Sequence, residues 1–244
     1  MRNSLFINKT SLIVFCLCIG LTTRDCIAQE ANKKGIAMWT ESFDLRDCNF
    51  STTGKTKYFI LEPGYQLILE GIDKENTIDL VIKVLDQTQK IGDIETRIVE
   101  EKETVNGKLI EISHNYYAFC MQTSSVFYFG EDVDLYKDGE IIDHSGSWRA
   151  DSRNAKAGLM MPGLILLGAK YYQEIAPAVA MDRAEILSYN ETIRTVAGNF
   201  ENCLKTEETT PLEPKNKEYK YYAPGIGLIR DGELLLTKYG HINK

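Results

Sequence analysis

Histidine is scarce in this chain, with only His114, His144 and His241 among its 244 residues. Zinc sites and catalytic triads usually draw on histidine, because neutral imidazole binds metals and titrates near neutral pH. The three histidines form no His-x-His or His-Glu-x-x-His spacing, and His114 shares a strand face with Ile110, Ile112 and Tyr116, as a sheet histidine does. The sequence therefore predicts no dedicated metal site and no bound cofactor.

Nucleophile motifs are also missing. A serine nucleophile needs a Gly-x-Ser-x-Gly turn between a strand and a helix, and Gly146-Ser147-Trp148 lacks the second glycine. Cys120 and His114 share one face of a single strand, yet six residues of strand separate them by about 20 Å. No catalytic motif of even moderate specificity is present, which favours a non-enzymatic function.

Long hydrophobic runs are absent apart from one near the start. Residues 12–21 are uncharged and apolar, which is about half of the roughly 20 residues that a transmembrane helix needs. Arg2 and Lys9 precede the run, and Cys26-Ile27-Ala28 follows it with small residues suited to signal peptidase. We expect residues 1–28 to be a signal peptide cleaved after Ala28, with no stable transmembrane anchor. Charged Arg24-Asp25 before Cys26 argues against lipid attachment, so a periplasmic or secreted protein is predicted.

Positive charge is in deficit. Removing residues 1–28 takes away three positive charges and one negative, so the formal charge moves from −7 to about −9 over about 216 residues. An acidic chain repels phosphate backbones, which disfavours nucleic-acid binding.

Only three cysteines remain after residue 28, namely Cys48, Cys120 and Cys203. An oxidising compartment allows one disulfide with one cysteine left over, and the pairing stays open at this stage. The alternative, that Cys120 and Cys203 are buried thiols acting as small hydrophobes, is favoured by their apolar surroundings. No Cys-x-x-Cys pair exists in the mature chain.

Helical signal is thin, whereas strand signal is dense from Tyr58 onward. Ile78, Leu80, Ile82 and Val84 alternate with polar residues, as in a strand with one buried face. Asn106-Gly107, Asp138-Gly139 and Asp231-Gly232 each separate two strand-like segments and favour two-residue hairpin turns. We predict an all-β fold with little helix, in which a single antiparallel meander of ten or more strands forms a curved sheet or partly open barrel. Residues 29–57 would form an N-terminal arm, 58–240 the β domain and 241–244 a tail.

Five segments stand out between residues 58 and 240, namely Leu61–Tyr65, Tyr128–Glu131, Gly146–Trp148, Gly198–Thr206 and Tyr221–Ile229. They resemble segments of a group of bacterial secreted proteins and lipoproteins of unassigned function, with the similarity spread over most of residues 58–240. The group has Pro-Gly where this chain has Pro177-Ala178, so we expect a different loop geometry there. The Tyr-x-x-Pro-Gly-x-Gly segment at 221–227 also resembles LolA-like periplasmic proteins, whose half-barrels hold acyl chains. This second, looser resemblance implies a fold and an apolar ligand, and it implies no catalytic residues.

Two sets of residues are candidates for a site. Glu174, Asp182 and Glu185 bracket the Pro177 loop and offer paired carboxylates for acid–base chemistry. The apolar stretch 160–167 is expected to pass inside the curved sheet. The adjacent tyrosines 171–172 and 221–222 are expected to place one ring on each face of the sheet. The predicted ligand-binding residues are Trp148, Met160, Leu164, Tyr171, Tyr172 and Tyr222.

Three functions remain open on this basis. The first is an exported, non-catalytic envelope protein whose curved sheet binds an apolar, lipid-like ligand or a protein partner. The second is a carbohydrate-active hydrolase that uses the carboxylates near residues 174–185. The third is a structural or interaction module of an envelope complex.

Overall fold

A computed structural model describes residues 38–152 and 154–241. The predicted signal peptide, the start of the predicted arm and residues 242–244 of the tail lie outside the described residues. The described chain forms the following strands: β1 (Phe50–Ser51), β2 (Gly54–Lys55), β3 (Ile60–Leu61), β4 (Tyr65–Asp73), β5 (Asn76–Ile91), β6 (Ile94–Val105), β7 (Lys108–Cys120), β8 (Ser125–Lys137), β9 (Glu140–Asp143), β10 (Trp148–Arg149), β11 (Lys156–Met161), β12 (Lys170–Tyr172), β13 (Glu174–Ile175), β14 (Arg183–Thr195), β15 (Gly198–Thr209), β16 (Glu218–Ala223), β17 (Gly227–Asp231) and β18 (Leu234–His241). No helix that could cross a membrane occurs within these two ranges.

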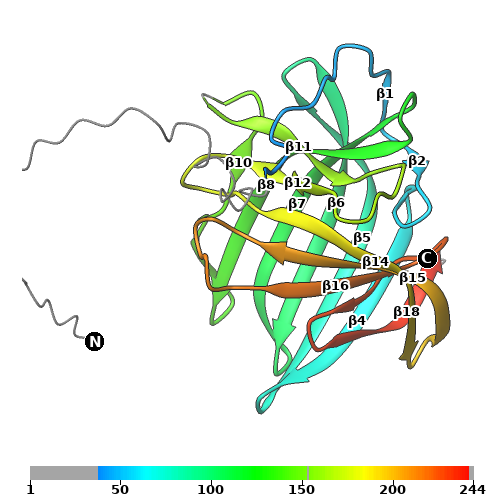
Figure 1. Ribbon diagram of the computed structural model, residues 1–244. Helices are drawn as coiled ribbons and strands as arrows, with labels where there is room; N and C mark the ends of the chain where they lie inside the picture. The colour runs from blue at the N-terminus through cyan, green and yellow to red at the C-terminus, as the bar shows by residue number, and fades with distance from the viewer. Residues whose placement is uncertain (1–37, 153, 242–244) are drawn as a thin grey trace, which may run out of the picture. The chain divides into compact units, whose positions relative to one another are not determined.

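The main sheet is an antiparallel meander that curls almost into a barrel (Figure 1). Strands β4 to β8 pair with their sequence neighbours, and so do β14 to β18. The last strand of the second run, β18, pairs with the first strand of the other run, β4, from His241 opposite Tyr65 to Leu235 opposite Glu70. This pairing joins the two runs into one curved wall. The predicted all-β, partly open barrel is confirmed.

The two ends of the sheet come together at residues 170–175, a short segment whose first part pairs with one end of the sheet and whose second part pairs with the other. β12 pairs with β14, whereas β13, two residues later, pairs with β11. A Cβ atom on Gly158 would lie 2.1 Å from the carbonyl oxygen of Gln173, so only glycine lets the two backbones approach here. Thr40 of the arm forms a parallel bridge to Tyr171 on the other edge of β12. The two ends of the sheet therefore approach each other only through these local contacts, and the seam between them is not sealed by a continuous ladder.

Two of the three predicted hairpin turns occur as expected. Asn106-Gly107 joins β6 to β7 and Asp138-Gly139 joins β8 to β9, with positive φ at all four residues, as a type I′ turn requires. The third turn is shifted by one residue, because Asp231 still pairs with Leu234 and the turn consists of Gly232-Glu233.

The inner core lies within the curved sheet. Alternate residues on strands from both runs meet there because side chains in a strand point alternately to the two faces. Its largest fully buried members are Tyr58, Leu61, Leu69, Met161, Ile186, Leu204, Ile229 and Leu236.

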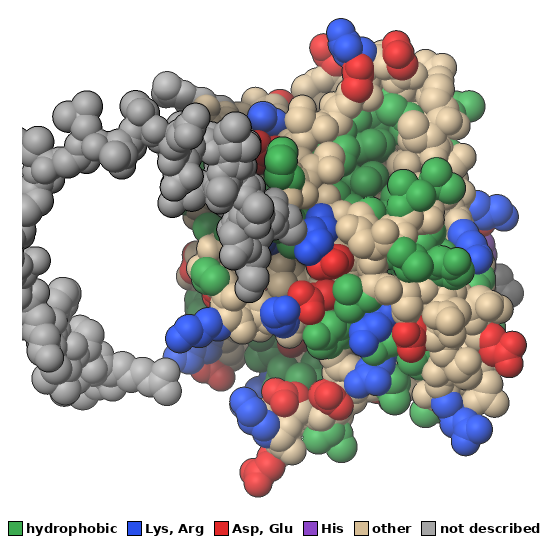
Figure 2. All heavy atoms as spheres, in the orientation of Figure 1, with side chains coloured by type: hydrophobic (Ala, Val, Ile, Leu, Met, Phe, Trp, Pro, Cys, Tyr) green, Lys and Arg blue, Asp and Glu red, His purple; other side chains and the backbone are tan. Residues whose placement is uncertain are grey.

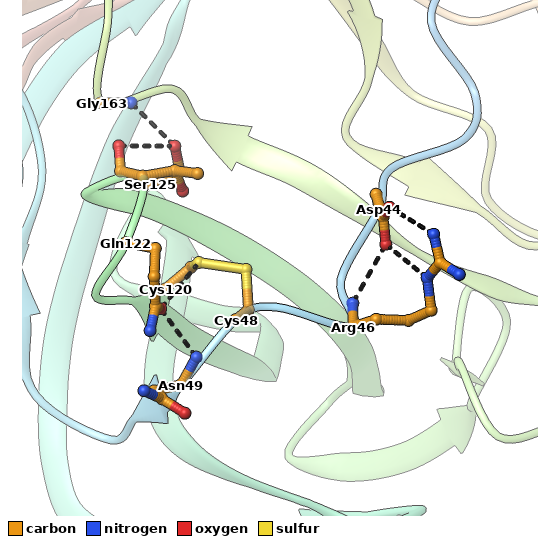
Figure 3. The surroundings of a disulfide bond; sticks show 9 residues. Asp44, Arg46, Cys48, Asn49, Cys120, Gln122, Ser125 and Gly163 are labelled. Carbon is orange, nitrogen blue, oxygen red and sulfur yellow. Dashed lines mark hydrogen bonds and ion pairs between the residues drawn. A yellow bond between two sulfur atoms is a disulfide. The ribbon is translucent and has the colours of Figure 1, made fainter.

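A second, outer core lies on the other face of β7 and β8. Phe43, Leu45 and Phe50 of the arm cover Phe127 and Phe129, and Phe50 packs edge-on against Phe129 at 5.3 Å between ring centroids. Cys48 and Cys120 form a disulfide at this place (Figure 3). Cys203 is free and buried. The interpretation of Cys120 as a free buried thiol was wrong, because the arm lies along β7 and brings Cys48 against it.

The apolar stretch 160–167 does not pass inside the sheet as a loop. Met161 belongs to β11 in the wall and is buried, but Leu164, Leu166 and Leu167 are 71%, 58% and 58% exposed. Continuous hydrophobicity here reflects a wall strand followed by an exposed apolar loop.

Candidate ligand cavity

The interior of the curved sheet contains two adjoining cavities. The larger has a volume of about 390 Å³ and a mainly polar wall, and the smaller has a volume of about 70 Å³ and an apolar wall. Glu101, Met160 and Lys220 line both. The two cavities therefore share a wall of three side chains.

Carboxylates dominate the polar cavity. Its wall carries one basic side chain, Lys220, and six acidic ones: Glu101, Glu131, Glu174, Asp182, Glu208 and Glu213. They come from β6, β8, β13, β15 and the neighbouring loops, and the alternation of each strand turns these residues inward. Ionised groups of one sign repel each other, so this wall favours a positively charged or proton-donating occupant.

Lys220 already has two partners. Its Nζ lies 3.1 Å from Oε2 of Glu208 and 3.5 Å from Oδ2 of Asp231. Burial alone would lower the pKa of Lys220, but these two carboxylates outweigh burial and raise it well above its usual value. Glu208 also accepts hydrogen bonds from Nε2 of Gln173 and the hydroxyl of Tyr222, each at 3.3 Å. The one basic side chain of the wall is thus already paired with Glu208 and Asp231.

Glu101 and Glu131 face the cavity without an ion-pair partner among the described residues. Burial raises the pKa of Glu101 to about 7, although Lys220 opposes the shift. Burial, followed by the charge of Glu101, raises the pKa of Glu131 to about 8. Both carboxyl groups therefore titrate near neutral pH.

Tyrosine and asparagine complete the wall beside Glu131. The rings of Tyr117 and Tyr128 lie 4.6 Å apart, and the Tyr128 hydroxyl donates to Oδ1 of Asn115. Asn115 in turn donates through Nδ2 to the carbonyl oxygen of Val99 at 3.3 Å. These neutral donors are satisfied within the protein.

The structure brings together two of the three predicted carboxylates. Glu174 and Asp182 line the polar cavity, where burial and their mutual repulsion raise the pKa of Glu174 well above its usual value. The pKa of Asp182 is also raised, first by burial and then by Glu208. Glu185 forms an ion pair with Lys170 at 2.8 Å and does not line the cavity.

The six predicted ligand-binding residues are dispersed. Met160 and Tyr222 line cavities. Tyr171 and Trp148 are buried in the inner core, where Trp148 packs against Tyr128 at 5.3 Å. Tyr172 points outward against Trp39 and Arg183, and Leu164 is exposed.

Sequence reasoning missed Glu101, Glu131 and Lys220. Charged residues occupy both faces of β6 between Glu100 and Glu103, so no alternation of apolar and polar residues marks the inner pair Glu101 and Glu103. A usable signal existed in Ser113 and Asn115, polar residues in an alternating strand that turn out to be buried. Buried polar residues need partners, and here the partners line the cavity.

Comparisons with known proteins identify no relative: no protein family, curated protein sequence or solved structure matches this chain. No cluster of three or more His, Cys, Asp or Glu side chains within the described ranges is arranged to hold a metal ion.

Proposed function

We propose that this chain is an exported, non-catalytic protein that binds a small ligand inside its curved sheet. The polar cavity of about 390 Å³ carries this proposal, since binding sites for small molecules typically have 300–1,000 Å³ and a few converging polar groups. Several of those groups have perturbed pKa values, which is characteristic of functional sites. The oxidised Cys48–Cys120 pair supports an extracytoplasmic location, where disulfides persist.

The two cavities narrow the ligand expected from the sequence. The apolar cavity has a volume of only about 70 Å³, well below the roughly 300–1,000 Å³ of typical small-molecule sites, so it is too small to hold a long acyl chain by itself. The ligand therefore has a polar part in the larger cavity and at most a short apolar part. A lipid remains an outcome that the experiment detects.

The experiment combines native mass spectrometry of the purified protein with a thermal-shift screen of small metabolites. Val179 lines the polar cavity and is partly exposed, so Val179→Trp narrows its mouth without entering the core. Val196, which is 83% exposed at the turn between β14 and β15, gives the matched control Val196→Trp. We expect at least one compound to raise the melting temperature of the wild type and of Val196→Trp and not of Val179→Trp. A screen in which no stabilising compound is sensitive to Val179→Trp would contradict the proposal.

One observation favours hydrolysis as a second candidate function. Glu174 and Asp182 face one cavity, and a protonated carboxyl beside an ionised one is the arrangement that glycosidases use. A panel of polysaccharides tests it with the double variant Glu174→Gln/Asp182→Asn. Any activity that survives this replacement unchanged excludes these residues as its source.

An interaction module is favoured by a different feature, the exposed Leu164, Leu166 and Leu167 between β11 and β12. Exposed apolar patches commonly mark contact surfaces. Cross-linking and co-purification test this role. The control is the triple variant Leu164→Ser/Leu166→Ser/Leu167→Ser. Equal recovery of partners by wild type and variant would contradict it.

A further inference from the structure

The donors and acceptors of the polar cavity wall are unequally satisfied. Lys220, Gln173 and Asn115 each donate to an acceptor of the protein itself. Glu101, Glu131 and Glu174 have no ion-pair partner among residues 38–152 and 154–241. Ser113 and Tyr128 donate to Glu131, and Tyr128 donates to Glu174, but Glu101 accepts no hydrogen bond from the described residues. The wall thus presents more acceptor positions than donors and no unpaired cation, so the complementary ligand brings hydrogen-bond donors and positive charge.

Glu101 shows this most clearly. Its side chain is half-buried and lines both cavities, and it accepts no hydrogen bond from the described residues. A carboxylate inside a cavity keeps less hydration than one in bulk water, and this loss is costly unless a bound partner replaces the water. An occupant with an N–H⁺ group supplies the missing partner.

The shape of the wall argues for an organic cation over a metal ion. The carboxylates do not converge on one point in the way that metal coordination requires, as far as the described part of the chain extends. Tyr117 and Tyr128 add aromatic rings to the same wall, and such rings attract ammonium and guanidinium groups. Carboxylates on separate strands suit an occupant that carries several N–H groups over a few bonds.

Building on the proposed ligand cavity, we propose that its ligand is a small organic cation with a primary ammonium or guanidinium group, bound by the carboxylate of Glu101 with Glu131 and Glu174 beside it. The ligand contacts the rings of Tyr117 and Tyr128 with its cationic nitrogen. Any short apolar part extends past Met160 toward the smaller cavity.

This proposal predicts coupling between binding and proton release. The charged and titratable side chains that face the inner site from the surrounding elements are Glu101, Glu103, Glu111, Glu131, Glu174, Asp182, Glu208, Glu213, Glu218, Lys220 and Asp231, with the phenols of Tyr65, Tyr117, Tyr128 and Tyr222. Burial holds the pKa of Glu101 at about 7 and that of Glu131 at about 8, so both are partly protonated at neutral pH in the empty cavity. A bound cation favours their ionised forms and displaces protons.

Isothermal titration calorimetry in amine-free buffers tests the proposal with putrescine and agmatine. The uncharged analogue 1,4-butanediol serves as the matched ligand control. We expect at least one of the two cations to bind, the diol not to bind, and the affinity to be about tenfold higher at pH 8.5 than at pH 6. Titrations at pH 7 in buffers of different ionisation enthalpy are expected to show proton release.

Two variants separate a local effect from a general effect of charge. Glu101→Gln removes the unpartnered carboxylate and is expected to weaken cation binding about tenfold or more, as the loss of a charge-assisted hydrogen bond does. Glu100→Gln makes the same change in net charge on the outer face of the same strand, beside His114, and is expected to change affinity less than twofold. Equal effects of the two variants, or equal binding of the diol, would overturn the proposal.

The remaining outcomes distinguish this proposal from the cavity function on which it rests. If neither cation binds while another small molecule binds in a manner blocked by Val179→Trp, the cationic ligand class is wrong and the cavity function stands. If no compound binds in that manner, both are wrong. Binding of Ca²⁺ or Mg²⁺ without binding of either amine would also overturn the organic-cation proposal.

Discussion

The two faces of strands β7 and β8 differ sharply in polarity, although the side chains of both faces come from the same two strands. On the outer face Tyr116, Ala118 and Cys120 of β7 lie beside Phe127 and Phe129 of β8, under the arm and its disulfide. On the inner face the alternate residues line the polar cavity: Asn115, Tyr117, Tyr128 and Glu131. The outer face is apolar and is cross-linked to the arm by the disulfide, whereas the inner face is polar and borders a cavity.

The charges of the two faces are organised differently as well. On the side of the molecule that Figure 2 shows, acidic and basic side chains are interspersed on the surface. Outward-facing Asp132 pairs with Arg149 at 2.6 Å, whereas its inward neighbour Glu131 has no such partner among the described residues. Paired charges at a surface cost little, but an unpaired carboxylate in an enclosed cavity lowers stability. The outer face of β7 and β8 therefore contributes more to stability, and the inner face carries the ligand binding that we propose.

The largest expected effect is at the centre of the outer core. Phe127→Ala removes a buried ring that packs against Phe43 at 5.7 Å and Phe50 at 6.0 Å between centroids. We expect it to lower the free energy of unfolding by about 3–5 kcal/mol in urea denaturation. Tyr128→Phe, its inner-face neighbour, removes one hydroxyl and is expected to cost about 1 kcal/mol. A smaller loss for Phe127→Ala than for Tyr128→Phe would reverse the comparison.

Loss of the disulfide comes next. Cys48 and Cys120 are 72 residues apart, so the bridge restricts a long loop of the unfolded chain, and the double variant Cys48→Ala/Cys120→Ala is expected to lose about 2–5 kcal/mol. Dithiothreitol is expected to destabilise the wild type to a similar extent and to leave the double variant unchanged. Cys203→Ala, which removes a free buried thiol, is the control and is expected to retain its sensitivity to dithiothreitol.

On the inner face, removal of a charge is expected to stabilise the protein. The pKa of Glu131 is raised in the folded state to about 8. Between about pH 4.5 and pH 8 the folded protein therefore binds more protons than the unfolded chain, and the free energy of unfolding falls as the pH rises through this interval. Glu131→Gln is expected to gain about 1–2 kcal/mol at pH 8 and little at pH 4.5, measured by urea denaturation at both values.

The neighbouring residue provides a control of opposite sign. Burial would raise the pKa of Asp132, but hydrogen bonds from Arg149 and Tyr116 outweigh burial and lower it. Asp132 therefore stabilises the fold above its unfolded pKa, and this stabilisation is lost as the pH falls. Asp132→Asn is expected to destabilise the protein at pH 8. Destabilisation by Glu131→Gln at pH 8 would contradict the conclusion that the unpaired carboxylate on the inner face lowers stability.

The smallest expected effect lies in the loop beside the cavity. Ala178 has a φ of +65°, a left-handed conformation that costs a non-glycine residue about 1–2 kcal/mol. The hydrogen bonds between Ala176 and Ala180 hold the turn in that conformation. Whether the loop differs from that of the resembling group stays a prediction. Ala178→Gly is expected to raise stability by about 0.5–1 kcal/mol in thermal unfolding, and Pro177→Gly to give no such gain.

Much of the fold could be predicted because its signals are local. The segments on either side of Asn106-Gly107 were predicted as strands, and the structure has strands Ile94–Val105 and Lys108–Cys120 there. The outward and inward rings of Tyr221-Tyr222 were likewise predicted from the period of a strand: Tyr222 is buried, and Tyr221 lies beside Lys205 and Arg230. Turn chemistry and period-two alternation involve neighbours in the sequence, so one sequence is enough to reveal them.

The candidate site was only half predicted for a physical reason. Glu174 and Asp182 lie eight residues apart across a loop that the sequence marks with Pro177, whereas Glu101, Glu131 and Lys220 come from three strands that meet only when the sheet curls. A carboxylate on a strand gives no sign in the sequence of whether it faces water or a cavity.

By itself the sequence determined the strands, most of their turns, the acidic charge and the absence of familiar catalytic motifs, because each depends on residue type or on spacing along the chain. The pairing of β18 with β4, the choice of Cys120 as the partner of Cys48 and the enclosure of the acidic cavity were decided by tertiary structure. These depend on which strands meet after the sheet has curled, and such contacts join residues that are far apart in the chain.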